Sequence, residues 1–453
     1  MAIRVMQTSQ PLQDPAVLAL RNRLRSGELV SGGGQLDVPA IVRKIILDVQ
    51  ARGDAAVLDA TRTLHYPAAR LGDLRVRPDE IAAAQRDCFV PSGLREPPHG
   101  ADGDFLKLIR RAADNIRQYQ ESILVKAPPP LRRGGRELAV RYTPMDRVAV
   151  YVPGGKALYP STVLMTVIPA QVAGVKEIAM VTVPQKDGRA DPQCLALAGE
   201  LGVSEVYAAA GVAALAALAI GTPMFPAVQK IVGPGSAFIA EAKRQLFGRV
   251  GIDSIAGPSE VLIIADKTAR ADFIAADMLA QAEHDPGSAI LITDSAELAR
   301  NVAEELDRQV AQLERAEAAR AGLEAYSAII VVGSIASACE LANEFATEHL
   351  EIMTADDAAA LSEIRNAGAI FVGPHSPVPV GDYYAGPSHV LPTGGTAKFS
   401  GPLSCNDFLK ASSVVKYDAA SLSADADDIA GFAAREGLTA HAKAVRIRSR
   451  KGP

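Results

Sequence analysis

The sequence has few of the features that mark secreted, membrane-bound or nucleic-acid-binding proteins. Its four cysteines are scattered without metal-type spacing, which favours isolated thiols in a reducing compartment over disulfides. With 47 Lys and Arg against 52 Asp and Glu, the net charge of −5 provides no basic field for nucleic acid or an anionic membrane. The longest apolar run, Val212–Ile220, is too short to span a bilayer, and residues 1–13 lack the apolar core of a signal peptide. These absences predict a soluble cytoplasmic protein with no nucleic-acid or membrane partner.

The order of apolar patterns predicts an α/β fold. The first 145 residues are expected to be mainly helical, with a Pro- and Gly-rich connector at 127–135. From residue 147, short apolar runs alternate with helical segments, and a second such series starts at residue 260, including one long helix over 297–320. This alternation is typical of parallel sheets with helical crossovers. We therefore expect two successive, incomplete Rossmann-like parallel-sheet domains, a helical N-terminal segment and a small helical C-terminal tail.

Two glycine-rich turns each follow an expected strand and open a helix. They are Gly154–Gly155 and Gly233–Gly235, and their backbone N–H groups are suited to holding phosphate. In parallel sheets, ligands bind beyond the carboxyl ends of the strands, where these turns lie. Neither turn matches Gly-x-Gly-x-x-Gly, and glycine after a strand also serves as an ordinary turn.

A possible metal site begins with Gln281 and His284. Residues three positions apart share one face of a helix, so the amide oxygen and the imidazole can reach one cation. Asp382 and His441 would complete a set of four nitrogen and oxygen ligands that zinc accepts. The spacing alone is also typical of a histidine that caps or packs at a helix end.

Glu348 and His349 form a candidate acid–base pair where a helix gives way to a strand. A neutral histidine is suited to taking a proton from an alcohol, and an adjacent carboxylate can steer water or tune the imidazole. Asp382 and His389 share a Gly- and Pro-rich loop, which is typical of turn-forming residues as well as of functional loops.

Together these segments resemble the histidinol dehydrogenase family, in the order and at the approximate spacing of the family's motifs over residues from about 30 to 446. The matching segments are Tyr151-Val-Pro-Gly-Gly-Lys156, Tyr159-Pro-Ser-Thr-Val-Leu-Met165, Ala256-Gly-Pro-Ser-Glu260, Gln281-Ala-Glu-His-Asp-Pro286, Glu348-His-Leu-Glu351, Gly381 to His389 continuing to Gly395, and Glu436-Gly-Leu-Thr-Ala-His441.

The resemblance implies a role for each matching residue. The zinc ligands, one ion per subunit, would be Gln281, His284, Asp382 and His441, and these also contact the substrate. His349 would be the general base and Glu348 the acid/base of the water-consuming step. The other substrate contacts would be Ser259, His389 and Glu436. The family oxidises L-histidinol through the aldehyde to L-histidine with two NAD molecules in succession.

The resemblance also implies a homodimer whose C-terminal tails reach into the partner subunit. We therefore expect a helical arm at 1–45 and a first α/β domain, built from 46–150 and 260–400, that carries the metal and catalytic site. A second α/β domain, 151–259, would bind the nucleotide, and a tail at 401–453 would complete the partner's site.

The expected cofactor positions depart from the family pattern. Of the three NAD-contacting positions only Tyr151 is retained, because Ala213 stands where the family has glutamine and Ser236 where it has asparagine. Loss of an amide hydrogen bond at Ala213 predicts weaker or rearranged NAD binding, by on the order of 1 kcal/mol. This departure leaves two alternatives: an NAD-dependent dehydrogenase of another small polar alcohol, and a non-catalytic zinc-bound dimer.

Overall fold

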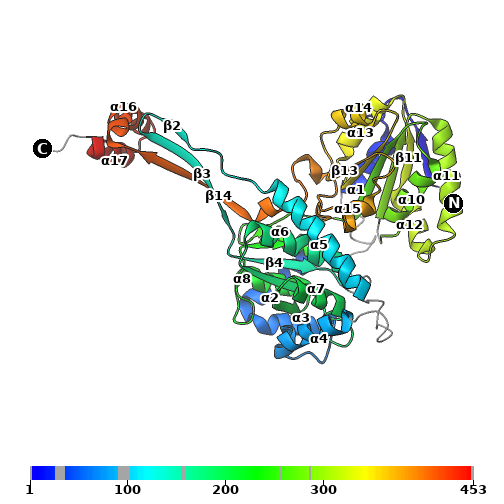
Figure 1. Ribbon diagram of the computed structural model, residues 1–453, viewed down its shortest axis with the longest axis horizontal. Coiled ribbons are helices and arrows are strands. Elements are labelled where there is room, and N and C mark those ends of the chain that lie inside the picture. Colours follow the sequence, from blue (N-terminus) through cyan, green and yellow to red (C-terminus); the bar gives the residue numbers. More distant parts are fainter. Residues whose placement is uncertain are drawn as a thin grey trace.

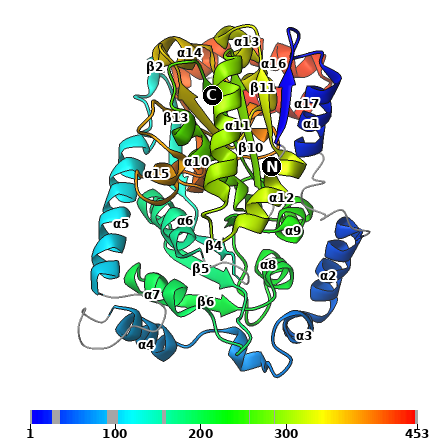
Figure 2. The same cartoon turned by 90° about the vertical axis from the view of Figure 1, so that its right-hand side faces the viewer.

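The computed structural model describes residues 3–25, 36–89, 103–154, 159–255, 257–284 and 287–449. Gly155, together with motif positions 156, 256, 285 and 286, lies outside these ranges. Two parallel sheets with helices on both faces form the body of the molecule, and a narrow antiparallel ribbon projects from it (Figure 1, and turned by 90° in Figure 2). The expected pair of successive parallel α/β units is therefore confirmed.

A five-stranded parallel sheet has the strand order β6-β5-β4-β7-β8. Its strands are β4 (Arg147–Val152), β5 (Glu177–Thr182), β6 (Glu205–Ala208), β7 (Lys230–Val232) and β8 (Gly251–Ile252). One face packs on α4 (Pro78–Cys88), α5 (Gly103–Ile123), α6 (Pro160–Ala173) and α7 (Pro192–Glu200). The other packs on α2 (Val38–Arg52), α3 (Asp54–Leu64), α8 (Gly211–Ile220) and α9 (Ala237–Leu246).

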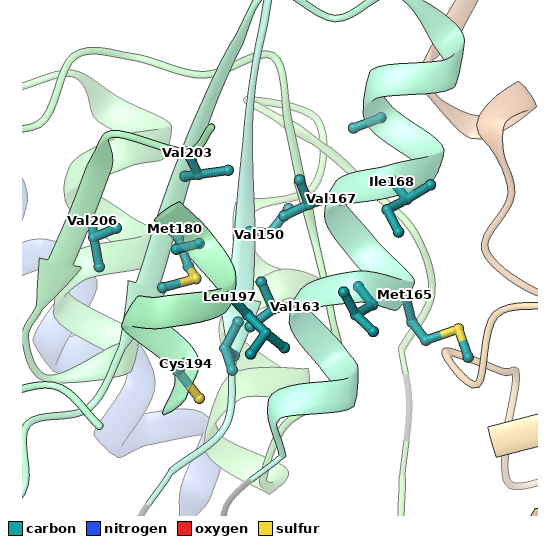
Figure 3. Packing of buried hydrophobic residues seen from close by; sticks show 14 of the residues in the cluster. Val150, Val163, Met165, Val167, Ile168, Met180, Cys194, Leu197, Val203 and Val206 are labelled. Atoms are coloured by element: carbon teal, nitrogen blue, oxygen red, sulfur yellow. The ribbon is translucent and has the colours of Figure 1, made fainter. Parts of the chain in front are cut away.

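The core of this unit is built from apolar strand residues and the helices above them. Figure 3 shows Val150 and Met180 of the sheet facing Val163 and Val167 of α6 and Leu197 of α7. All five side chains are fully buried. Each such side chain contributes about 1.5–3 kcal/mol relative to an exposed one, so this packing holds the strand ends that border the cavity.

A six-stranded parallel sheet has the order β1-β11-β10-β9-β12-β13. Its strands are β1 (Arg4–Gln7), β9 (Ser259–Ala265), β10 (Gly287–Thr293), β11 (Ala328–Val331), β12 (His349–Met353) and β13 (Ala369–Val372). Helices α10 (Ala271–Ala282), α11 (Ala296–Val310) and α12 (Ala316–Tyr326) cover one face. Helices α1 (Pro15–Arg25), α13 (Ile335–Phe345) and α14 (Asp357–Glu363) cover the other, and the short α15 (Val378–Tyr383) follows β13.

The third sheet is an antiparallel ribbon with the order β14-β3-β2. It consists of β2 (Leu131–Arg133), β3 (Arg136–Pro144) and β14 (Leu409–Tyr417), and it carries α16 (Ala419–Arg435) and α17 (Thr439–Ser449). Three short 3-10 turns complete the described elements: Leu71–Leu74, Thr396–Lys398 and Cys405–Phe408, the last called η4. Figure 1 shows α16 and α17 at the far end of the ribbon, away from both parallel sheets.

Several element assignments made from the sequence were wrong. Residues 131–133 of the expected connector, residues 136–144 after it and residues 409–417 of the expected helical tail are strands. The pairing of β3 with β14 joins segments more than 250 residues apart, which local periodicity does not reveal. The long helix expected over 297–320 is two helices, α11 and α12, interrupted at residues 311–315.

The contacts also differ from the expected domain boundaries. The first 45 residues are not one helical arm, because β1 pairs with β11 of the six-stranded sheet whereas α2 packs on the five-stranded sheet. Helices α3, α4 and α5 likewise pack on the five-stranded sheet rather than on the six-stranded one. The reason is that amphipathic helices carry no mark of which apolar sheet they will cover.

Candidate active site

A cavity of about 950 Å³ lies between the two parallel sheets. Of the twelve residues predicted to bind substrate, cofactor or metal or to act in catalysis, all but Gln281, Glu436 and His441 line it. These nine are Tyr151, Ala213, Ser236, Ser259, His284, Glu348, His349, Asp382 and His389. The first three come from the five-stranded unit and the others from the six-stranded unit and the segments that follow it. The fold therefore brings the expected cofactor and catalytic positions to one space.

The two sheets present opposite strand ends to this cavity. The five-stranded sheet presents carboxyl ends, since Tyr151 lies near the end of β4 and Gly233 directly follows β7. The six-stranded sheet presents amino ends, since Ser259 and His349 are the first residues of β9 and β12. The rule that ligands bind at carboxyl ends thus holds for only one half of this site.

His349 is buried and has one free ring nitrogen. Its Nδ1 lies 3.2 Å from the backbone oxygen of Glu260, so Nδ1 carries a proton and donates it there. Its Nε2 has no hydrogen-bond partner in the described part of the chain and lies 3.5 Å from Oδ1 of Asp382. Burial alone would lower the pKa of His349, but the carboxylates of Glu348 and Asp382 outweigh burial and raise it to about 9. Since Nδ1 is committed to the Glu260 carbonyl, the deprotonated imidazole can accept a proton only at Nε2.

Glu348 is held in place from two sides. Its Oε2 accepts hydrogen bonds from the Ser259 hydroxyl at 2.6 Å and from the Glu260 backbone N–H at 3.1 Å. The same oxygen lies 3.6 Å from Nδ1 of His349. Burial raises the pKa of Glu348. A carboxyl group with a raised pKa can exchange a proton with bound water, as expected for an acid–base residue.

Three of the four expected zinc ligands lie at this end of the six-stranded unit. Gln281 ends helix α10, and His284 follows it in the turn toward β10. The buried side-chain nitrogen of Gln281 has no hydrogen-bond partner among the described residues. Burial lowers the pKa of His284. Burial would raise the pKa of Asp382, but its charge contact with His349 and the other histidines nearby lower it.

A neutral imidazole, an ionised carboxylate and an amide oxygen are the forms in which these side chains bind zinc, so the residues present fit a zinc ion. Within the described ranges, no group of three His, Cys, Asp or Glu side chains forms a metal site by itself.

The remaining expected ligand and substrate contact are not at this site. His441 lies on α17 and Glu436 directly follows α16, and both side chains are exposed at the far end of the ribbon (Figure 1). The structure of one chain therefore separates these two residues from the nine that line the cavity.

His389 joins the two α/β units across the cavity. Its Nδ1 lies 3.0 Å from the backbone oxygen of Asp382, and its Nε2 lies 3.2 Å from the hydroxyl of Thr162 on α6. Burial lowers its pKa, so the ring is neutral and acts as a hydrogen-bonding group.

The expected cofactor positions lie on the five-stranded side of the cavity. The ring of Tyr151 packs against Gly211, where a Cβ atom would come within 2.9 Å of it. Ala213 is buried on α8, and Ser236 is exposed where α9 begins. All three line the cavity, so a nucleotide there would meet a methyl group and a hydroxyl where amides were expected.

Three site residues were not recognised from the sequence: Thr162, Glu260 and Arg315. Arg315 is the only Lys or Arg side chain lining the described part of the cavity. Its position was hidden because it lies in the break between α11 and α12, where one continuous helix was expected. An exposed cation facing this space could hold an anionic group such as a phosphate.

Fold and site together define an enzyme with an acid–base pair at a cleft between two parallel α/β units. A family model described as Histidinol dehydrogenase matches residues 33–449. Curated histidinol dehydrogenases from Geobacillus kaustophilus and Rhodopirellula baltica are each 46% identical to this chain. The alignment with the Geobacillus kaustophilus protein covers 96% of this chain and 98% of that protein. The alignment with the Rhodopirellula baltica protein covers 95% of this chain and 93% of that protein.

A solved structure supports the same assignment. The crystal structure of histidinol dehydrogenase from Elizabethkingia anophelis matches with a TM-score of 0.87 at 31% identity, covering 99% of this chain and 98% of that one. The chain belongs to the histidinol dehydrogenase family and is therefore an oxidoreductase. No helix in the described ranges is long and apolar enough to cross a membrane.

Proposed function

We propose that this enzyme oxidises L-histidinol through the aldehyde to L-histidine, with one zinc ion per subunit and two successive NAD molecules. The names of its relatives support the substrate. The observation that carries the chemistry is the buried His349, whose free Nε2 lies 3.5 Å from Asp382 in the cavity wall, with Glu348 held beside it.

In the first oxidation, His349 accepts the proton of the substrate hydroxyl at Nε2. Nδ1 is already committed to the Glu260 carbonyl, which fixes both the tautomer and the ring orientation. A bound NAD would supply the hydride acceptor, and a redox-silent zinc ion held by Gln281, His284 and Asp382 would supply a fixed anchor for the substrate. Such an anchor would keep the aldehyde in the site for the second step.

In the second oxidation, water adds to the aldehyde and the resulting diol loses a proton and a hydride. Glu348 serves the proton exchange with water, because its carboxyl is buried and its pKa is raised. Ser259 donates to Glu348 and thereby orients it toward the cavity. His389 is neutral and is held in place by its hydrogen bonds with Asp382 and Thr162, so it provides a fixed polar contact for the substrate.

Gln281, His284 and Asp382 would hold the zinc, and His441 of a second copy would complete its ligand set. His441 and Glu436 lie at the end of a projecting arm, far from the cavity of their own chain. This position supports an exchanged tail, because in a dimer the arm can bring both residues to the cavity of the partner subunit. We accordingly propose a homodimer in which each arm completes the other subunit's site.

NAD would lie on the five-stranded side of the cavity, beside Tyr151, Ala213 and Ser236. Arg315, which faces the same space from the six-stranded unit, would offset the negative charge of the cofactor's phosphates. This cation supplies part of the affinity that the alanine and serine positions lack.

The test is NADH formation with L-histidinol by the purified enzyme, before and after chelation and again after zinc is restored. We expect two NADH per histidine, loss of turnover on chelation and recovery with zinc. The His349→Asn variant is the control, because it should bind zinc normally and yet lose turnover. Absence of turnover with zinc bound and NAD saturating, or a clear preference for another amino alcohol, would contradict the proposal.

A further inference from the structure

A buried ion pair outside the acid–base site hydrogen-bonds the backbone of a turn that borders the cavity. Lys243 on α9 and Asp253, just after β8, have side chains that are only 1% and 4% exposed, and they contact each other. The Lys243 ammonium donates to the backbone oxygen of Gly233 at 3.0 Å. The backbone N–H of Gly233 donates to Oδ2 of Asp253 at 2.7 Å.

Gly233 opens the turn that leads from β7 into α9. Its φ of +118° is a conformation that favours glycine, and a Cβ atom there would lie 2.3 Å from the backbone oxygen of Tyr151. Pro234, Gly235 and Ser236, which follow directly, line the cavity. The turn is therefore pressed against Tyr151 on one side and open to the cavity on the other.

General stability does not explain this arrangement well. A buried ion pair loses much of its attraction to desolvation, and apolar residues of similar volume are often as stabilising. What apolar residues cannot do is satisfy a backbone carbonyl and a backbone N–H of the same residue at once. That task requires a donor and an acceptor side by side, which Lys243 and Asp253 supply.

We propose that Lys243 and Asp253 are positioning residues that hold the turn 233–236 in the shape that admits the nucleotide cofactor. This inference rests on the proposed function only in that the cofactor is NAD and binds at this turn. The ion pair acts through the backbone of Gly233 and not through the side chain of Ser236.

The experiment compares three variants of the full-length enzyme with wild type. Lys243→Met removes the cation, and Lys243→Arg keeps it. Lys230→Met is the matched control, since Lys230 is also a buried lysine of this sheet but its ammonium bonds the backbone oxygen of Asp407 instead. Hydrogen–deuterium exchange of the peptide containing 233–236 is measured without ligand, and KM for NAD, KM for histidinol and kcat are measured with zinc bound.

We expect Lys243→Met to speed exchange in this peptide and to raise KM for NAD by about tenfold or more, with kcat at saturating NAD and KM for histidinol changing little. In Lys243→Arg, the exchange rate of the peptide and KM for NAD should both stay close to wild type. Lys230→Met should change neither the exchange rate nor KM for NAD. Unchanged exchange and KM in Lys243→Met, or the same changes in Lys230→Met, would overturn the proposal.

Two further points keep the test decisive. If Lys243→Met does not fold, the double variant Lys243→Met/Asp253→Leu removes both charges together and should still loosen the turn. If wild type shows no NAD-dependent turnover, the proposed function fails, while exchange in the ligand-free protein still decides whether the ion pair holds the turn.

Discussion

His349 and His389 line the same cavity, but their pKa values move in opposite directions. Two carboxylates outweigh burial at His349 and raise its pKa to about 9, whereas burial prevails at His389 and lowers its pKa. Both rings donate from Nδ1 to a backbone carbonyl. Only His349 keeps a free Nε2 in the described structure, since Nε2 of His389 is bonded to Thr162. Residue type alone therefore did not separate the base from the hydrogen-bonding histidine.

The raised pKa of His349 predicts a rate that increases with pH. The imidazole must be unprotonated to accept the hydroxyl proton, so kcat/KM for histidinol should rise with pH through the pKa of His349 and then level off. Glu348→Gln removes a carboxylate that raises this pKa, so the rising limb should move to lower pH even though the second oxidation is impaired. The pH profile of the first NADH formed measures this, and an unmoved limb would contradict the assignment.

Arg315 provides a second prediction at the residue scale. Replacement by methionine should raise KM for NAD by about tenfold or more, because a hydrogen bond to a charged group contributes about 1.5–3 kcal/mol. Zinc content and KM for histidinol should stay as in wild type. Arg320→Met, which changes an exposed arginine on α12, is the control. Equal effects of the two variants would show that Arg315 has no specific role.

At the scale of elements, the end of α10 sets the position of two proposed metal ligands, Gln281 and His284. Gly287, the first residue of β10, lies so close that a Cβ atom there would be 2.1 Å from the backbone oxygen of Gln281. The helix end and the strand start can approach this closely only because residue 287 has no side chain. The Gln281–His284 pair is thus placed by backbone packing as well as by helix periodicity.

We predict that Gly287→Ala displaces Gln281 and weakens zinc binding by roughly tenfold to a hundredfold, the range for disturbed ligand support. Gly333→Ala is the matched control, since no atom lies within 4 Å of a Cβ built at Gly333. Zinc retained after dialysis against a chelator is the readout. Wild-type retention in Gly287→Ala would show that the helix end adapts to the extra methyl group.

Also at this scale, the sequence predicted elements unevenly. Apart from β1 and β8, the strands of the parallel sheets were predictable, because strands buried on both faces appear as continuous apolar runs, as in Val261–Ala265. Strand β1 was missed because most of its side chains are exposed, and β8 because it has only two residues. Strands β3 and β14 were not, because most of their side chains are at least partly exposed and their pairing joins distant segments. The break before Arg315 was missed because no Pro or Gly marks it.

At the scale of the whole molecule, the projecting arm separates His441 from His349, the proposed base. Ribbon pairing over all nine residues of β14, together with the Arg136–Asp425 ion pair at its tip, makes the arm an ordered element. An arm of this kind can place helices α16 and α17 on a second copy without rearranging its own body (Figure 1).

Mixing two inactive variants tests the exchange of arms. His349→Asn and His441→Ala should each be nearly inactive alone. After the two are mixed, unfolded and refolded together, half of the dimers should be mixed and each should contain one intact site, so that activity recovers to about a quarter of wild type. No recovery would mean that each chain completes its own site.

By itself, the sequence determined the chemical groups and the class of fold. Side-chain identity is local information, so the acid–base pair Glu348–His349, the expected ligands and the apolar strands were all accessible from it. Tertiary structure decided which of these groups meet. It placed nine of them around one cavity, put His441 and Glu436 at the end of an arm, and joined Lys243 to Asp253 around Gly233. Such choices depend on packing between segments far apart in the chain, which no local periodicity encodes.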